Sequence, residues 1–358
     1  MKPHIIVVGA GINGAVLAYH LAQGGAQVTL IEAQTPASAA SGRSFGWINA
    51  SFYLDETHFH LRHAGIAAWQ ALGRELGDLG LHWPGCLWWE EEGAAFDRKE
   101  AELLALGYPC RRVSRGEFAV LEPAVACPPE QSLLFTSEGA VDLVVATERL
   151  LSAAAAHGAV LWTGVAVTGF RCVGGRITGV DTPAGPVAAD QVVLATGTAT
   201  SGLAAGVGVT LPMLDRPGVL VRTLPCPPLL HHILASPGQE LRQTPQGHIL
   251  APASAAHQTD TAEVISETPD RLAGQALARL GALLPATNLR ADRVLQAWRP
   301  VPADGLPAVG PTTMAGLYIV TLHSGATLAA LVGRLAATEI LTGVADSALA
   351  PFRPARFA

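Results

Sequence analysis

The sequence predicts an α/β protein with two domains, and three observations support this prediction. An apolar run at residues 5–8 leads through a glycine-rich turn into a helical pattern and then a second strand at 27–31, which is a β-α-β unit. Short β-prone runs punctuated by prolines fill residues 212–296, as is typical of an antiparallel sheet. The chain has 358 residues, of which 49% are hydrophobic and 15% charged, so it is long and apolar enough for two domains with a large core.

The β-α-β unit carries a dinucleotide-binding motif. Its turn is a GxGxxG at residues 9–14, and an acidic residue, Glu32, ends the second strand. Gly9 permits the tight turn, Gly11 lets the backbone approach a pyrophosphate, and Gly14 allows close packing of helix on strand. The helix N-terminus offers N–H groups and a positive dipole end to phosphates. Glu32 would accept bonds from both ribose hydroxyls and disfavours the 2′-phosphate of NADP. The alternative is an ordinary β-α-β turn without a ligand.

The loop after the second strand is small, polar and rich in candidate phosphate donors. Ser41, Arg43 and Ser44 lie in it and would be close to the phosphate site. Phe45 and Trp47 are unusual in a solvated loop. We therefore favour a binding role for this loop over a plain surface loop.

A helix is predicted over residues 58–80, because apolar residues recur on one face until a glycine ends the pattern. His58, His60 and His63 lie close together on it, but no cysteine or carboxylate pair completes a metal site. The sequence therefore predicts solvated helix histidines and no metal. The acidic run 90–92 is likewise predicted to be a solvated turn.

The remaining pattern alternates short strands and helices. The apolar strand 191–197 ends in small residues, which lets backbone approach a cofactor. Near the C-terminus, a glycine-bearing turn at 323–327 opens a second helix, whose N-terminus is a second dipole site. The other predicted strands are 86–90, 158–162, 165–172, 176–182, 187–189, 219–224, 231–235, 240–244, 248–251, 263–266, 293–299 and 317–322, and the other helices are 97–106, 114–122, 143–157, 270–284 and 328–342.

Charge and cysteine content exclude several classes of protein. The formal net charge is −6 and no basic cluster exists, which argues against a nucleic-acid partner. Five scattered cysteines without a CxxC argue against disulfides and zinc and favour a reducing compartment. A strand beginning at residue 4 or 5 leaves no room for a signal peptide, and no uninterrupted apolar run has transmembrane length. The sequence predicts a soluble, cytoplasmic protein without a membrane span.

Four separated segments together resemble one family. They are GAGINGAVLAYHLA with Glu32, SGRSFGWINAS, VVLATGTA, and WRPVPADGLPAVGP followed by YIVTLHSGATLAALVGRLAATEIL. This combination resembles the FAD-dependent D-amino-acid oxidase superfamily, in its glycine oxidase, sarcosine oxidase and D-hydroxyproline dehydrogenase branch. The resemblance implies a discontinuous Rossmann-like FAD-binding domain and a mixed-sheet α+β substrate domain, as in glycine oxidase. The FAD-binding domain would comprise residues 1–85, 139–214 and 293–358, and the substrate-binding domain residues 86–138 and 215–292, which match only as a general layout.

The resemblance also assigns residues to FAD, bound at the boundary of the two domains. The turn at 324–328 would direct its N–H groups and helix dipole at the flavin N1 and C2 carbonyl, where reduction places negative charge. Val167 would meet the adenine through its backbone. The residues implied for FAD are Gly9, Gly11, Ile12, Asn13, Gly14, Glu32, Ala33, Ser41, Gly42, Arg43, Ser44, Gly46, Trp47, Val167, Ala195, Gly197, Arg299, Ser324, Gly325, Ala326, Thr327 and Leu328.

Two residues are implied to be catalytic. Arg299 matches the arginine that holds the substrate carboxylate, and a guanidinium can bond a carboxylate through two parallel contacts. The alternative for Arg299 is a structural ion pair. His323 stands where the glycine oxidase pattern has a second arginine, so that charge would be missing or pH-dependent. His323 and His248 are also candidates for tuning the protonation of the amine.

Two departures from the family pattern concern the cofactor. Ala297 stands where sarcosine oxidases have a flavin-bonding cysteine, so the FAD is predicted to be non-covalent. Those enzymes also place a lysine over the flavin to activate oxygen, whereas this chain has only Lys2 and Lys99, neither in a plausible place. The electron acceptor, oxygen or a redox partner, therefore stays open.

The resemblance implies an enzyme that oxidises the C–N bond of an amino acid or N-substituted glycine. A hydride would pass to FAD, and the resulting imine would hydrolyse. The alternatives are a subunit of a dye- or quinone-linked amino-acid dehydrogenase and a non-catalytic FAD-binding protein. An NAD-dependent dehydrogenase is a weaker alternative, because it does not explain the C-terminal turn. Homo- or hetero-oligomers are compatible with all of these.

Overall fold

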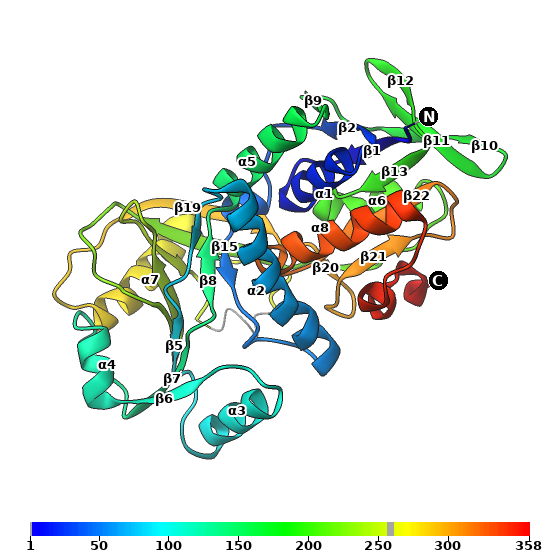
Figure 1. The fold of residues 1–358 in the computed structure, drawn as a ribbon. Helices are drawn as coiled ribbons and strands as arrows, with labels where there is room; N and C mark the ends of the chain where they lie inside the picture. The colour runs from blue at the N-terminus through cyan, green and yellow to red at the C-terminus, as the bar shows by residue number, and fades with distance from the viewer. Residues whose placement is uncertain (1, 256–260) are drawn as a thin grey trace.

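Two large sheets occupy opposite halves of the molecule in the computed structural model, which describes residues 2–255 and 261–358 (Figure 1). The first sheet has six strands. Five adjacent strands run parallel to one another, and the sixth, at one edge, runs antiparallel to its neighbour. Its order is β21-β22-β13-β1-β2-β9, with bounds Ala308–Pro311, Leu317–Thr321, Gln191–Leu194, His4–Val8, Gln27–Glu32 and Val160–Thr163. The predicted α/β fold is confirmed.

One face of this sheet is covered by long helices. Alternate strand residues such as Ile5 and Val7 point into one core cluster, while Ile6 and Val8 point into a second cluster on the other face. The helices of the first cluster pack closely, because a Cβ at Gly333 of α8 would lie only 2.5 Å from the Val16 side chain of α1. These helices are α1 (Ile12–Gln23), α2 (Glu56–Leu76), α5 (Leu143–Ala156) and α8 (Gly325–Thr342).

The opposite face is covered by a small antiparallel sheet and α6 (Thr200–Ala205), which follows the short 3₁₀ turn η2 (Gly197–Ala199). The predicted strand 165–172 is wrong at its start. Residues 165–168 form loop contacts instead, since Val165 N–H donates to the Glu32 carbonyl. The small sheet consists of β10 (Gly169–Val173), β11 (Arg176–Thr182) and β12 (Gly185–Ala188).

The second large sheet has eight strands from three parts of the chain. It is mixed, because β16 pairs parallel with β5 while its other pairs are antiparallel. The edge strand predicted at 263–266 is wrong, since those residues have no strand structure. The strand predicted to start at residue 293 begins earlier, so that residue 293 falls inside edge strand β19. The order is β19 (Ala291–Trp298), β15 (Pro217–Thr223), β18 (Ile249–Pro252), β17 (Gln239–Gln243), β16 (Ile233–Ser236), β5 (Cys86–Trp88), β7 (Gln131–Phe135) and β6 (Arg111–Ser114).

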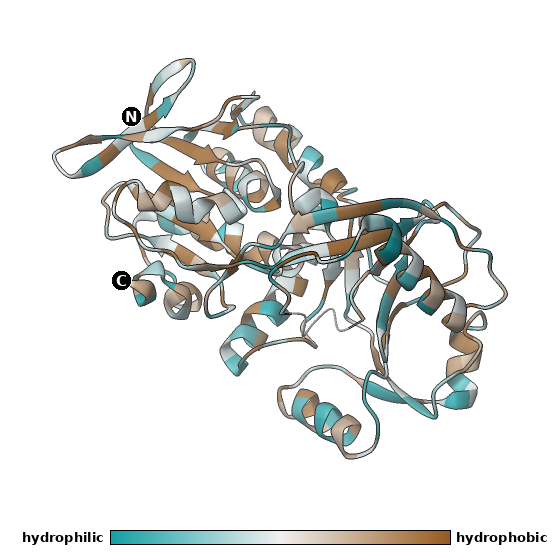
Figure 2. Cartoon of the chain, turned by 180° about the vertical axis from the view of Figure 1, so that it is seen from behind, coloured by the Kyte–Doolittle hydropathy of each residue, from teal (hydrophilic) through white to brown (hydrophobic). Residues whose placement is uncertain are grey.

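Smaller elements join the two halves or extend them. The helix predicted at 97–106 begins earlier, at Gly93, and Figure 2 shows alternating hydrophilic and hydrophobic bands along it. These elements are α3 (Gly93–Ala105), α4 (Arg115–Leu121), α7 (Pro269–Leu283), η1 (Ser41–Arg43), the sheet of β3 (Trp47–Ile48), β8 (Gly139–Val141) and β4 (Leu81–His82), and the pair β14 (Met213–Leu214) and β20 (Val301–Pro302).

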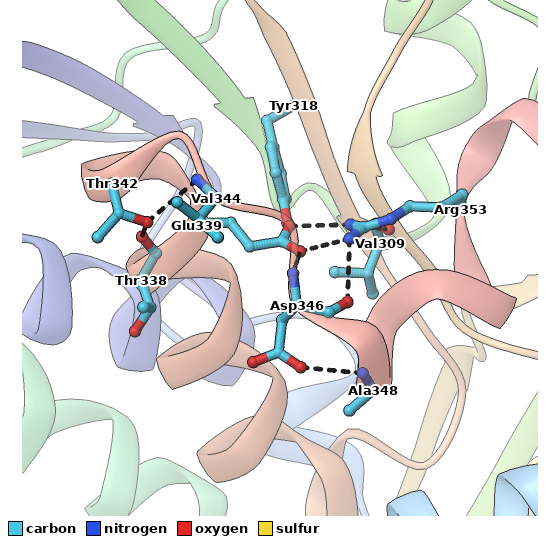
Figure 3. Close-up of polar contacts among 9 residues, drawn as sticks. All are labelled: Val309, Tyr318, Thr338, Glu339, Thr342, Val344, Asp346, Ala348 and Arg353. Carbon is cyan, nitrogen blue, oxygen red and sulfur yellow. Dashed lines mark hydrogen bonds and ion pairs between the residues drawn. The ribbon is translucent and has the colours of Figure 1, made fainter.

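The C-terminal segment is fastened to α8 by a buried carboxylate, Glu339 (Figure 3). Tyr318 and Arg353 both donate hydrogen bonds to Glu339, and the Asp346 N–H donates to its Oε1 at 2.6 Å. Arg353 also donates to the Val309 carbonyl in β21. This network fixes the 3₁₀ turns η4 (Ser347–Phe352) and η5 (Pro354–Phe357) against α8 and the sheet edge.

Helix α8 is the one helix in the described residues that is long and apolar enough to cross a membrane. In this structure 61% of its most apolar window is buried, against α1 and α2. The predicted start at Leu328 is three residues late. The helix begins at Gly325 because Ser324, with φ of +59°, turns the chain sharply out of the preceding strand.

Candidate active site

A cavity of about 1060 Å³, including its open mouth, lies where the two halves meet. The helices α1, α2, α5 and α8 and the loop before β3 contribute one part of its wall, and β15 and the end of β19 contribute another. It is lined by Ile12, Asn13, Ala40, Ser41, Arg43, Ser44, Phe45, Gly46, Trp47, Asn49, Arg62, Leu143, Gly218, Val219, Leu220, Ala297, Arg299, Pro300, Leu322, His323, Ser324, Gly325, Ala326 and Thr327.

The N-terminus of α1 opens on this cavity, where its N-cap residue Gly11 offers no capping side chain and the Ser41 hydroxyl accepts a hydrogen bond of 3.1 Å from the Ile12 N–H. Gly9 has φ of +99°, and a Cβ at Gly14 would lie 1.9 Å from the Gly9 carbonyl oxygen, so glycine is required at both positions. The buried Oδ1 of Asn13 has no hydrogen-bond partner among the described residues. A helix end of this kind, with a polar atom left unpartnered, suits a phosphate-bearing ligand with hydroxyl donors.

Glu32 lies at the carboxyl end of β2, next to this turn. Its two oxygens accept hydrogen bonds of 2.8 Å from the N–H groups of Ala10 and Gln34. The backbone thereby fixes the carboxylate in one orientation. A carboxylate in this position suits the hydroxyls of a ribose.

The N-terminus of α8 meets the same site. Its first residue, Gly325, lies so close to α1 that an added Cβ would be 3.6 Å from Ile12 Cγ2 and 3.9 Å from the Asn13 amide. Ser324 at its N-cap makes no side-chain capping bond. Two helix N-termini therefore converge on one cavity, and their dipoles both favour negative charge there.

Arg299 and His323 line the cavity together. The Arg299 guanidinium donates from Nε to the Arg216 carbonyl at 3.3 Å and from Nη2 to the Pro217 carbonyl at 3.2 Å. The His323 Nδ1 lies 3.4 Å from the Ser324 hydroxyl. An arginine anchored to strand carbonyls at a cavity wall suits an anionic ligand group.

Sequence reasoning missed a buried cation in this cavity, Arg62 of α2. It donates from Nη1 to the Ser324 hydroxyl at 2.7 Å, and from Nε and Nη2 to the Asn49 carbonyl and side-chain oxygen. Burial lowers its pKa to about 10, so it stays charged at neutral pH. A signal existed, because Arg62 shares the helical spacing of Phe59, Ile66 and Trp69 and so lies on the apolar stripe.

A second missed residue, Glu138, lies behind the loop that lines the cavity. It is fully buried and accepts hydrogen bonds from Trp47 Nε1 at 2.8 Å, Tyr108 Oη at 2.9 Å and Ser51 Oγ at 2.5 Å. Desolvation raises its pKa to about 7, although these donors oppose the shift. Glu138 therefore holds the cavity-lining Trp47 in place.

The other predicted residues lie around the cavity in different ways. Ala195 packs against Gly9 and Gly14 of the turn, Gly42 lies against the Ala37 carbonyl, and a Cβ added at Gly197 would lie 3.8 Å from Pro300. Not among the lining residues are Gly9, Gly11, Gly14, Glu32, Ala33, Gly42, Val167, Ala195, Gly197 and the fully buried Leu328, whereas Ile12, Asn13, Ser41, Arg43, Ser44, Gly46, Trp47, Arg299, His323, Ser324, Gly325, Ala326 and Thr327 line it.

Two predictions about polar residues are wrong, and two further polar residues lie outside the cavity. His58 is not solvated, since it is buried and its pKa is lowered to about 4. Glu90 is half-buried, accepts a bond from Trp88 and has its pKa raised to about 7 by desolvation. The Lys99 ammonium donates to the Ser51 carbonyl, and Lys99 does not line the cavity. His248 bonds the Thr223 carbonyl and does not line the cavity either.

Comparison with known proteins gives the family. The model of a family described as FAD-dependent oxidoreductase matches residues 4–339. A glycine oxidase of Geobacillus kaustophilus is 28% identical, with 97% of this chain and 95% of that protein covered. A D-amino acid dehydrogenase of Methylobacterium nodulans is 27% identical, with 95% of each chain covered.

Solved structures agree in fold. The G. kaustophilus glycine oxidase structure has a TM-score of 0.88 at 25% identity, with all of both chains covered. An L-proline dehydrogenase from P. horikoshii has a TM-score of 0.88 at 24% identity, covering 99% of this chain and 98% of that one. The family model spans nearly the whole chain and its cofactor suits the converging helix ends, so this protein belongs to the FAD-dependent oxidoreductase family.

Proposed function

We propose that this enzyme oxidises the C–N bond of an amino acid or N-substituted glycine. One observation carries the proposal: a single cavity holds both the uncapped N-terminus of α8 and Arg299. The helix end would face the electron-accepting ring of FAD, and the guanidinium would hold a substrate carboxylate beside it. The glycine oxidase and D-amino acid dehydrogenase relatives act, by their names, on substrates of this class.

The cofactor would be held by the first part of the chain. The α1 N-terminus and Ser41 would meet its diphosphate, and Glu32 would accept bonds from its ribose hydroxyls. The family position of a flavin-bonding cysteine is Ala297 here, which lines the cavity and has no nucleophile. We therefore propose non-covalent FAD.

Arg299 would position the substrate so that its Cα–H faces the cofactor, which when bound supplies the hydride acceptor. The Cα–H bond breaks with its electron pair leaving as hydride, and the amine loses a proton as the C=N bond forms. Water then adds to the imine carbon, giving an oxo acid and a free amine or ammonia. The chain's contribution is binding, orientation and exclusion of water around Arg299 and Trp47.

A second candidate is a dehydrogenase subunit that passes electrons to a dye, a quinone or another protein. The D-amino acid dehydrogenase relative favours it. Neither lysine of the chain lines the cavity in the part that the structure describes, so no ammonium is available there to activate oxygen. We also propose a cytoplasmic location, because the five cysteines are scattered and free.

The test is anaerobic reduction of the FAD-loaded protein by glycine, sarcosine, other N-alkylglycines, D-amino acids and prolines, followed by air. We expect at least one panel member to bleach the flavin absorbance. Rapid return of the colour in air indicates an oxidase, whereas slow return indicates the dehydrogenase. A loaded protein that no carboxylate-bearing amine bleaches contradicts the proposal. Acid precipitation of the same sample should release all of the FAD.

A first variant tests the ribose contact. Glu32→Gln is expected to raise the Kd of FAD by about 10- to 100-fold. The amide NH2 of the new side chain would face a backbone N–H, where two donors meet, and the negative charge of the carboxylate is lost. Titration of apoprotein with FAD, followed by flavin fluorescence, measures this change. Gln34→Ala is the matched control, since it keeps the backbone N–H that bonds Glu32. Equal FAD affinity in Glu32→Gln and the wild type would exclude the assigned role.

A further inference from the structure

We propose that Arg62 is the fixed positive charge of the flavin end of this site, and that it raises the reduction potential of bound FAD. The inference rests on the proposed position of the cofactor in the cavity. It assigns a role in tuning the cofactor to a residue of α2. Arg62 acts on the cofactor, whereas Arg299 acts on the substrate.

The first support is how firmly Arg62 is held. Only 4% of its surface is exposed, and each of its three nitrogens donates a hydrogen bond. Two go to Asn49 and one, of 2.7 Å, to the Ser324 hydroxyl. All three acceptors are neutral oxygens, so these bonds orient the guanidinium without cancelling its charge.

The second support is the close packing of α2 on the start of α8. A Cβ at Gly65 would lie 2.6 Å from the Thr327 carbonyl oxygen, so glycine is needed for this approach. Gly65 is one turn along from Arg62 on the same face of the helix. The contact therefore places the Arg62 guanidinium at the N-cap of α8, where the helix dipole already favours negative charge.

The third support is the charge balance. No carboxylate forms an ion pair with Arg62 within residues 2–255 and 261–358. Glu138 is the carboxylate that influences it through space, from behind the loop. A buried cation of this kind is costly unless an anion completes its surroundings. Reduced flavin carries negative charge at N1 and the C2 carbonyl, which is the anion that this end of the cavity would receive.

The experiment measures the midpoint potential of bound FAD by equilibration with a reference dye, without substrate. The proteins are FAD-loaded wild type, Arg62→Gln, Arg62→Lys and Arg279→Gln. Loss of the charge is expected to weaken the binding of reduced FAD at least tenfold relative to that of oxidised FAD. A tenfold change lowers a two-electron potential by about 30 mV. Arg62→Lys should restore most of the shift. Arg279→Gln is the matched control, because Arg279 is a partly buried arginine that donates to Gln239 and to the Ala253 carbonyl and does not line the cavity.

Two outcomes overturn the inference. One is a potential of Arg62→Gln equal to that of the wild type. The other needs no variant, in case Arg62→Gln fails to fold: a wild-type potential no higher than that of free FAD at the same pH. The measurement uses no substrate, so failure of the substrate panel would overturn the proposed function alone. Normal reduction by substrate with an unshifted potential would overturn the role of Arg62 alone.

Discussion

Arg299→Gln is expected to lower kcat/KM for a carboxylate-bearing amine by about 10³-fold, because the proposed charge-assisted partner of the substrate carboxylate is lost. Most of this loss should be in KM, since the carboxylate does not change during the reaction. The measurement is the rate of anaerobic flavin reduction at increasing substrate concentration. The Arg299 guanidinium donates to the carbonyls of Arg216 and Pro217, which orient it at the wall of the cavity.

Two comparisons separate binding of the carboxylate from a general disturbance. Arg299→Lys keeps the charge but not the planar fork, and should lie between the wild type and Arg299→Gln. The amine that corresponds to the substrate without its carboxylate should react equally slowly with the wild type, Arg299→Lys and Arg299→Gln. If Arg299→Gln slowed the decarboxylated amine as much as the amino acid, Arg299 would not be the carboxylate anchor.

Glu138→Ala is expected to lower the free energy of unfolding by about 4 kcal/mol, because it leaves several buried donors without an acceptor. These are the Trp47 indole N–H and the hydroxyls of Tyr108 and Ser51. Urea unfolding followed by tryptophan fluorescence measures the change. Glu138→Gln keeps one acceptor oxygen and should lose less. A loss below about 1 kcal/mol in the alanine variant would show that water replaces the carboxylate.

The same residue gives a pH dependence with a definite sign. The folded-state pKa of Glu138, about 7, lies above its ordinary value of 4.5, so the folded state binds the proton more tightly. Its contribution to stability is therefore complete below pH 4.5 and is lost as the pH rises through 7, by about 3 kcal/mol. Glu138→Gln should flatten this decline in part. The pKa of Glu90 is also raised to about 7, so Glu90 contributes to the loss of stability over the same pH range. Glu90→Gln should therefore remove another part of the decline.

The sequence predicted those parts of the fold whose signals are local. The turn 9–14 and Glu32 lie between apolar runs of regular period, and the structure has the β-α-β unit there. The two helix N-termini were also predictable, because glycine-bearing turns precede both helical patterns. Their meeting was not predictable from spacing alone, since it depends on β22 lying two strands from β1 in the sheet.

The residues that sequence reasoning missed depend on distant packing. Glu138 follows a strand as any turn residue does, and only the arrival of Trp47, Ser51 and Tyr108 buries it. Arg62 lies on an apolar stripe, but α8 supplies the contact that fixes it. In the same way, the sequence shows Glu90 in an acidic run that looks solvent-exposed. Its half-buried position depends on neighbours from other strands, which desolvate it.

The order of the strands has a consequence for synthesis of the protein. The central strand β1 is made first, but its neighbour β13 follows more than 180 residues later, and β22 and α8 come after residue 316. A growing chain therefore exposes the free edge of β1 until β13 has been made, and the free edge of β13 until β22 has been made. The two helix N-termini can converge only once α8 has been made, so the complete cavity forms late in synthesis.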